Sequence, residues 1–180
     1  MRGDGPSARA YLIGVGSAQG ADALGWLVAD GVAALNRPWL KVRKVASPID
    51  LLEFVSPELP LALVDATEAP LPASALWRFR WPELPCESWQ ALSSHAFDLR
   101  YVLQLAGSLQ LLPQTVLIYA VDATRVRVPE SDERYHSSQT VPLDLVVRWV
   151  VDDYERTVAQ KASISSGPVA AATERRDVGH

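Results

Sequence analysis

Three short, nearly continuous hydrophobic runs predict buried strands along the chain. They span residues 10–15, 61–64 and 115–121. A strand that is apolar on both faces is typical of the interior of a parallel sheet. A fourth segment, residues 40–45, alternates apolar with basic side chains, and this alternation predicts a strand near the edge of the same sheet.

Helical periodicity appears between these runs. Apolar residues recur every three or four positions within 23–35, 97–109 and 142–158, which predicts three amphipathic helices. A shorter helix is predicted over 48–55, because Ser47 is a capping residue ahead of a proline at the first helical position. Strands that alternate with helices are joined by right-handed crossovers. The pattern predicts an α/β fold, a three-layer sandwich with a mainly parallel sheet and helices on both faces.

Two further segments depart from this alternation. Trp77, Phe79 and Trp81 alternate with arginines at period two and are flanked by prolines, which predicts a two-faced edge strand. We favour core packing over a binding platform for these aromatic side chains, because aromatic stripes usually fill cores. Residues 161–180 are rich in Ser, Ala, Gly and charge, so we expect a disordered tail after a single domain over residues 1–160.

The composition is that of a soluble globular protein. The 180 residues are 48% hydrophobic and 21% charged, with a net charge of -4, which indicates neither a nucleic-acid partner nor an anionic membrane surface. No hydrophobic run reaches the roughly 18 residues of a membrane-spanning helix, and the N-terminus lacks the features of a signal peptide. The single Cys86 excludes an internal disulfide and fits a reducing compartment. We therefore expect a cytoplasmic protein.

The glycine-bearing loop after the first strand only partly matches a dinucleotide-binding fingerprint. That fingerprint needs glycines at its first, third and sixth positions. Gly14 and Gly16 fit, but the sixth position is Gln19, and Asp22 puts negative charge where a pyrophosphate would approach the helix. The competing interpretation, a nucleotide-binding domain, assigns the phosphate to three basic residues, Lys41, Arg43 and Lys44.

Three side chains are predicted to meet beyond the carboxyl ends of the strands. Asp22 follows the first strand, Asp65 caps the second buried strand, and His95 precedes the helix at 97–109. Two carboxylates and an imidazole suit a borderline divalent ion such as nickel, zinc or manganese, and three protein ligands leave positions open for water or substrate. Each also has a structural interpretation: Asp22 as an N-cap, Asp65 as a paired buried acid, and His95 as part of a capping turn. A small metal-dependent hydrolase is one class that fits the three residues together.

Four motifs follow one another within residues 10–160. They are Gly14-Val15-Gly16 leading to Asp22-Ala23-Leu24-Gly25, then Val64-Asp65-Ala66, Glu83-Leu84-Pro85 and Ser93-Ser94-His95. In this order and spacing the chain resembles the nickel-iron hydrogenase maturation endopeptidases. Ser17 stands where that family usually has asparagine, and Ala21 where a second acid is common.

The resemblance implies an activity and a site. Members of the family remove a short C-terminal extension from the precursor of the hydrogenase large subunit after nickel insertion, so we expect a metal-dependent endopeptidase with that precursor as partner. The metal-binding and catalytic residues of the family fall on Asp22, Asp65 and His95. The resemblance implies that nickel arrives with the substrate, and that the free protein, expected to be a monomer, accepts a surrogate divalent metal. The alternative that Ser17 and Ala21 leave open is a paralogue that binds the precursor without cutting it.

Overall fold

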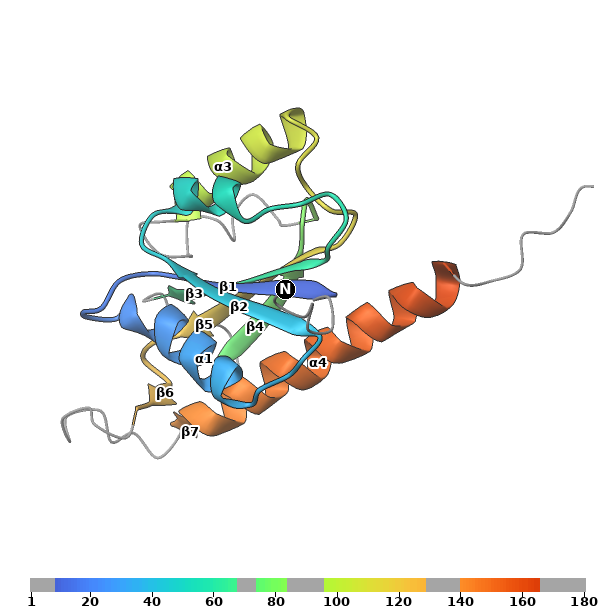
Figure 1. Ribbon diagram of the computed structural model, residues 1–180. Coiled ribbons are helices and arrows are strands. Elements are labelled where there is room, and N and C mark those ends of the chain that lie inside the picture. The colour runs from blue at the N-terminus through green and yellow to red at the C-terminus, as the bar shows by residue number, and fades with distance from the viewer. Residues whose placement is uncertain (1–8, 68–73, 84–95, 129–139, 166–180) are drawn as a thin grey trace, which may run out of the picture.

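A five-stranded sheet forms the centre of the computed structural model, which describes residues 9–67, 74–83, 96–128 and 140–165 (Figure 1). The strands are β1 (Ala10–Val15), β2 (Leu40–Val45), β3 (Leu61–Thr67), β4 (Leu76–Arg80) and β5 (Val116–Asp122). Their order in the sheet is β2-β1-β3-β5-β4. All neighbours are parallel except β4 and β5. The mainly parallel sheet is therefore confirmed, with β2 and β4 at its two edges.

Helices cover both faces of the sheet (Figure 1). One face carries α1 (Ala23–Ala34) and α4 (Leu143–Ser165), and the other carries α3 (Ala96–Ser108) and a 3-10 helix, η1 (Pro48–Glu53). A small parallel pair, β6 (Val126–Arg127) and β7 (Val141–Pro142), leads into α4. This arrangement confirms the three-layer α/β sandwich.

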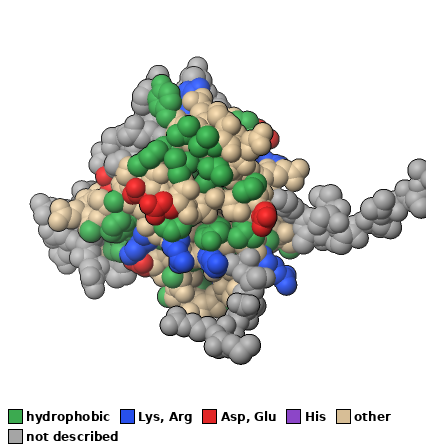
Figure 2. Space-filling view, turned by 45° about the horizontal axis from the view of Figure 1, so that its top comes forward, with side chains coloured by type: hydrophobic (Ala, Val, Ile, Leu, Met, Phe, Trp, Pro, Cys, Tyr) green, Lys and Arg blue, Asp and Glu red, His purple; other side chains and the backbone are tan. Residues whose placement is uncertain are grey.

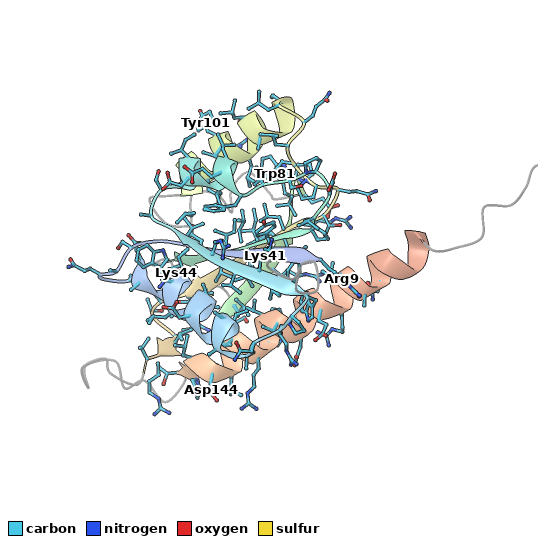
Figure 3. The ribbon with its side chains drawn as sticks, viewed as in Figure 1. Arg9, Lys41, Lys44, Trp81, Tyr101 and Asp144 are labelled. Carbon is cyan, nitrogen blue, oxygen red and sulfur yellow. The ribbon has the colours of Figure 1, made fainter. Side chains whose placement is uncertain are left out.

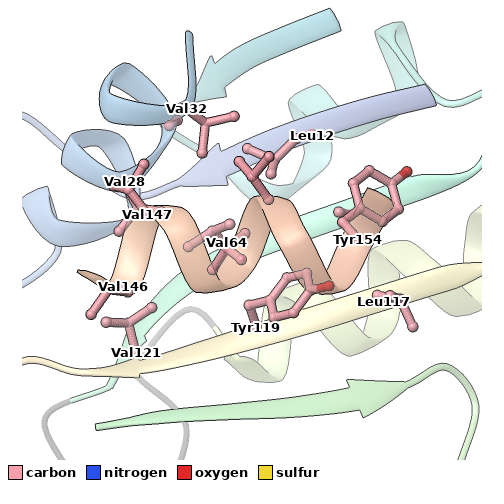
Figure 4. Close-up of a cluster of buried hydrophobic side chains, with 14 of the residues drawn as sticks. Leu12, Val28, Val32, Val64, Leu117, Tyr119, Val121, Val146, Val147 and Tyr154 are labelled. Atoms are coloured by element: carbon pink, nitrogen blue, oxygen red, sulfur yellow. The ribbon is translucent and has the colours of Figure 1, made fainter. Parts of the chain in front are cut away.

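Alternate residues of each central strand enter two different cores. The core under α1 and α4 holds Leu12, Val64 and Tyr119 from the strands, with Val28 and Tyr154 from the helices (Figure 4). Burial of one such side chain stabilises the fold by roughly 1.5–3 kcal/mol. Because helices cover both faces, the central strands β1, β3 and β5 are apolar except for the polar residues near the carboxyl ends of β3 and β5, and this is the pattern that the sequence shows.

A second core lies between the sheet and the helices α3 and η1. The β4 aromatics Trp77 and Phe79 pack against it, with ring centroids 5.8 Å apart, and Trp81 is partly buried beside them. The aromatic stripe therefore contributes to core packing, as we expected. Proline follows Trp81 in a cis peptide bond, at the end of the edge strand.

An ion-pair network ties α4 to the sheet on the other face. The hydroxyl of Tyr119 in β5 donates a hydrogen bond to the Asp153 carboxylate of α4 at 2.8 Å. Arg78 of β4 pairs with the same carboxylate at 3.3 Å. Burial, and then the hydrogen bond to Asp153, raise the pKa of the Tyr119 hydroxyl well above its usual range. The contacts hold α4 across two strands that are far apart in the sequence.

Three elements end later in the chain than predicted. β3 runs two residues past Asp65, and β5 includes Asp122, because the ladder between them continues to the pair Thr67 and Asp122. The helix α4 continues to Ser165, past Lys161, where we expected the tail to begin. The remainder of the predicted tail, 166–180, lies outside the described residues, as does Cys86. In the ranges that the structure describes, no helix is long and apolar enough to span a membrane.

Candidate functional site

The loop that carries Asp22 closes tightly over the end of β1. Gly16 has φ of +148°, a value that L side chains rarely adopt, and a Cβ atom at this position would collide with the carbonyl oxygen of Asp22. Gly16 thus serves a turn that brings residue 22 back to the end of the strand, whereas at Gly14 a Cβ would collide with the Gly25 carbonyl oxygen of α1. This geometry explains the glycine spacing without a bound phosphate.

The helix α1 sits directly on the backbone of the sheet through a second close approach. A Cβ at Gly25 would collide with the Val15 carbonyl and lie 3.0 Å from the Val64 carbonyl oxygen. Asp22 precedes Gly25 by about one helical turn, and Asp65 follows Val64 directly. The close packing of α1 on the sheet therefore brings the chain segments of Asp22 and Asp65 together near the carboxyl ends of β1 and β3.

Asp22 occupies the N-cap position of α1 and is half-buried. Its backbone is helical, with φ of -63° and ψ of -20°, and its side chain makes no capping hydrogen bond. A capping residue normally has extended backbone and accepts a bond from the first turn. The structure therefore does not support a capping role for Asp22.

Asp65 lies inside β3 and is only 3% exposed. It stands opposite Ala120 of β5, which belongs to the core under α3 and η1. Side chains alternate along a strand, and Val64 belongs to the opposite core, so Asp65 is directed toward the α3 side. The pairing of Gly14 with Val64 puts the last residue of β1 level with Asp65, so β1 ends beside this carboxylate.

The predicted third residue, His95, lies outside the described residues. The helix α3 begins at the next position and is about 20 Å long at 1.5 Å per residue, enough to cross the length of the sheet. Its last turn lies a few residues before β5, so its first turn lies at the edge where the parallel strands end (Figure 1). Within the ranges that the structure covers, no three His, Cys, Asp or Glu side chains are grouped to hold a metal ion. Asp22 and Asp65 share this edge, and the three-ligand site stays a prediction.

A buried carboxylate that the sequence analysis missed lies at the same edge. Asp122 is fully buried at the end of β5. It accepts hydrogen bonds from the N–H and the hydroxyl of Thr124, at 2.9 and 2.6 Å, and lies 3.5 Å from Nε of Arg125. An Asp followed two residues later by Thr, directly after an apolar run, is the sequence signal of such a turn. Through these contacts Asp122 stabilises the turn that follows β5.

The two departures from the family motifs, Ser17 and Ala21, flank the exposed tip of the Asp22 loop and are themselves half-buried. The Ser17 hydroxyl donates to the Gln19 carbonyl at 3.0 Å, and Leu24 N–H donates to the Ala21 carbonyl at 3.1 Å. Both residues therefore belong to local turns ahead of α1. Neither contact depends on an acidic side chain at position 21.

The basic residues of the nucleotide-binding interpretation have local partners on the edge strand β2. Lys44 Nζ lies 2.9 Å from the Asp30 carboxylate, and Lys41 Nζ lies 5.7 Å from the ring centre of Tyr11. The Arg43 guanidinium donates to the preceding carbonyl at 2.9 Å. Figure 3 shows Lys41 and Lys44 along β2, and Figure 2 shows basic side chains in a row across this face, below a group of hydrophobic ones. They form a solvated edge rather than a cradle at the start of α1.

A cavity of about 330 Å³ lies at the opposite end of α1 from Asp22. Its lining comes from the last turns of α1 and the start of β2 and includes Val32, Asn36, Arg37 and Leu40. It is therefore separate from the edge that carries the two acids.

Comparison with known proteins gives matches in structure alone. No protein-family model matches the chain, and no curated protein matches it. The hydrogenase maturating endopeptidase HybD from E. coli superposes with a TM-score of 0.57 at 18% identity, covering 85% of this chain and 93% of that one. The NiFe hydrogenase maturation protease HybD from Thermococcus kodakarensis gives 0.56 at 17% identity, covering 83% and 99%.

A third solved structure, an endopeptidase from Escherichia coli, gives a TM-score of 0.51 at 17% identity, covering 87% of this chain and 94% of that one. At these identities the likeness is one of fold. The structural neighbours are hydrogenase maturation endopeptidases, the family that the sequence motifs resemble.

Proposed function

We propose that this protein is an endopeptidase of hydrogenase maturation, which removes a C-terminal extension from the precursor of a nickel-iron hydrogenase large subunit. The observation that carries the proposal is the extent of the structural match. Two endopeptidases named for hydrogenase maturation cover 85% and 83% of the chain, and their own lengths are covered almost completely. Asp22 and Asp65 lie near the carboxyl ends of strands that belong to this shared fold.

In this proposal Asp22, Asp65 and His95 bind the nickel that the precursor carries. Carboxylate oxygens and an imidazole nitrogen are donors that nickel accepts, and three ligands leave room for those of the substrate. The Asp65 side chain is only 3% exposed. Burying a carboxylate in its charged form is costly unless a cation or hydrogen-bond donors face it. Binding that requires nickel would restrict cleavage to precursors in which insertion is complete.

The reaction of this proposal is the hydrolysis of one peptide bond. A water oxygen adds to the scissile carbonyl carbon, the C–N bond breaks, and the amine of the extension leaves with a proton. A carboxylate within hydrogen-bond reach of that water can accept its proton, and a metal that polarises the carbonyl lowers the barrier further. Asp22 and Asp65 are the candidates for the proton acceptor because both lie near the carboxyl ends of the parallel strands.

The test is incubation of the purified protein with nickel-loaded precursor, followed by intact-mass spectrometry. We expect the precursor to lose the mass of its extension, and nickel-free precursor to stay intact. Asp22→Asn and Asp65→Asn should each lower the rate by at least about 100-fold. Asp152→Asn is the matched control, because this carboxylate is exposed on α4, a helix that carries neither of the two acids; its rate should stay within about twofold.

Two outcomes would contradict the proposal. Tight binding to a precursor that stays intact would indicate a paralogue that binds without cutting. Equal cleavage of nickel-free and nickel-loaded precursor would show that nickel is not the recognition element.

A further inference from the structure

One backbone oxygen accepts hydrogen bonds from both sides of the Asp22 loop. The carbonyl of Val45, the last residue of β2, accepts from the Gly16 N–H at 3.1 Å and from the Trp26 indole Nε1–H at 3.0 Å. Gly16 lies before Asp22 in the chain and Trp26 after it. A single atom on the edge strand therefore ties the start of the loop to the first turns of α1.

The indole of Trp26 is itself fixed to β2 by a second contact. Lys44 Nζ lies 5.1 Å from the Trp26 ring centre, and the same ammonium group pairs with Asp30 at 2.9 Å. Asp30 follows Trp26 by four residues on α1, so both lie on one face of the helix. Trp26 is thus held at its ring face and at its N–H.

The tip of the loop makes contacts of another kind. Residues 18–20 are exposed, and the bonds between Ser17 and Gln19 are local. A Cβ at Gly20 would meet no atom within 4 Å. The tip therefore does little to place the loop relative to the sheet, whereas the two bonds at Val45 tie it to β2.

We infer that Trp26 is a positioning residue for Asp22, acting through the Val45 carbonyl that it shares with Gly16. The role of Asp22 rests on the proposed function, whereas the tie between loop and strand is a property of the fold. Active-site groups must be held to within about 0.5 Å, and a displacement near 1 Å costs about 100-fold in rate. Loss of one indole N–H should therefore affect turnover far more than folding.

Trp26→Phe tests this inference, because phenylalanine keeps a ring beside Lys44 and removes the N–H. The chain also offers a matched control, Trp39→Phe. The Nε1 of Trp39 is buried with no hydrogen-bond partner in the part of the chain that the structure describes, and its ring packs 6.0 Å from that of Tyr154. The two variants lose the same atoms, but only Trp26→Phe loses a hydrogen bond.

The first measurement is amide hydrogen exchange by NMR under native conditions. Trp26→Phe should speed exchange at the hydrogen-bonded amides that flank the loop, Gly16, Ala23 and Leu24, by about tenfold or more, with core amides of β3 unchanged, because local opening raises exchange only there. Trp39→Phe should leave the loop within about twofold. Unchanged exchange at Gly16, or an equal rise across all core amides, would overturn the inference. If Trp26→Phe does not fold, benzothienylalanine at position 26 replaces the N–H by sulfur at nearly the same shape.

The second measurement is cleavage of nickel-loaded precursor. A positioning role predicts that kcat falls by about tenfold or more in Trp26→Phe while KM stays within about twofold, and that Trp39→Phe changes neither. Unchanged kcat together with faster loop exchange would show that the tie exists without positioning Asp22, and would overturn the catalytic part. If the unmodified protein cleaves no precursor, the proposed function fails, and the exchange result still decides whether Trp26 holds the loop.

Discussion

Replacing Gly25 by alanine tests how closely α1 must approach the sheet. The new Cβ would collide with the Val15 carbonyl oxygen and lie 3.0 Å from that of Val64. Both oxygens belong to the backbone of adjacent parallel strands, so neither can rotate out of the way as a side chain would. The helix must instead lift away from β1 and β3, and it carries Asp22 with it.

The cost combines two opposing effects. Alanine favours a helix over glycine by about 1 kcal/mol. Overpacking against a rigid backbone costs up to about 3 kcal/mol. Lifting α1 also loosens the packing of Leu24 and Val28, which are buried in the same core, at a further cost of roughly 1 kcal/mol. We expect the free energy of unfolding to fall by about 3 kcal/mol in Gly25→Ala, measured by urea denaturation followed by circular dichroism.

Gly107→Ala is the matched control for this prediction. In α3 a Cβ at Gly107 would have its nearest neighbour, the Leu112 Cδ1 atom, at an ordinary 3.7 Å. The variant should therefore be as stable as the parent protein or about 0.5 kcal/mol more stable. A Gly25→Ala protein within 1 kcal/mol of the parent would refute the reasoning, because it would mean that α1 does not rest on bare backbone.

Two further predictions concern buried polar groups. Burial raises the pKa of the hydroxyls of Tyr119 and Tyr154 in the folded protein, whereas an unfolded tyrosine ionises near pH 10. Their contribution to stability is therefore complete below about pH 10 and is lost as the pH rises, by about 1.4 kcal/mol per pH unit for each tyrosine. Urea unfolding between pH 9 and about pH 11 should show a shallower decline in either single Phe variant, and an unchanged slope would contradict the assignment. Asp122→Ala should cost about 2–4 kcal/mol because two Thr124 donors lose their acceptor, whereas Asp122→Asn keeps an acceptor oxygen and should cost less; equal losses by thermal unfolding would argue against those bonds.

The sequence predicted which chain segments carry the acids of the candidate site, Asp22 and Asp65, but missed Asp122 beside them. Asp65 stands out because it directly follows the apolar run 61–64, and Asp22 stands out because it is the acid in the loop between the first strand and its helix. The predicted strands ended with their apolar runs, at residues 64 and 121, and so left out Asp65 and Asp122. The ladder of backbone hydrogen bonds between β3 and β5 includes both residues. A carboxylate side chain does not end a strand whose backbone is paired, because the N–H and C=O groups of the two strands continue to satisfy each other.

Trp26 shows a second limit of sequence reasoning. In the sequence Trp26 is only one more large residue within the helix predicted over 23–35. Its partner, the Val45 carbonyl, belongs to a strand 19 residues further along the chain. No local pattern relates an indole N–H to a backbone oxygen at that separation, because the contact exists only after α1 has docked against the sheet.

The sequence by itself determined the α/β class, the basic edge strand, the aromatic strand and the Gly16 turn that closes the Asp22 loop, because hydrophobic period and glycine φ preference are local properties. Only the tertiary structure decided that Asp65 faces the α3 side, that Asp122 is engaged by its own turn, and that the Val45 carbonyl holds both sides of the loop. Those features depend on which strands pair, in which register, and on which face each helix packs. They arise from contacts between segments far apart in the chain, and the order of residues within one segment does not specify them.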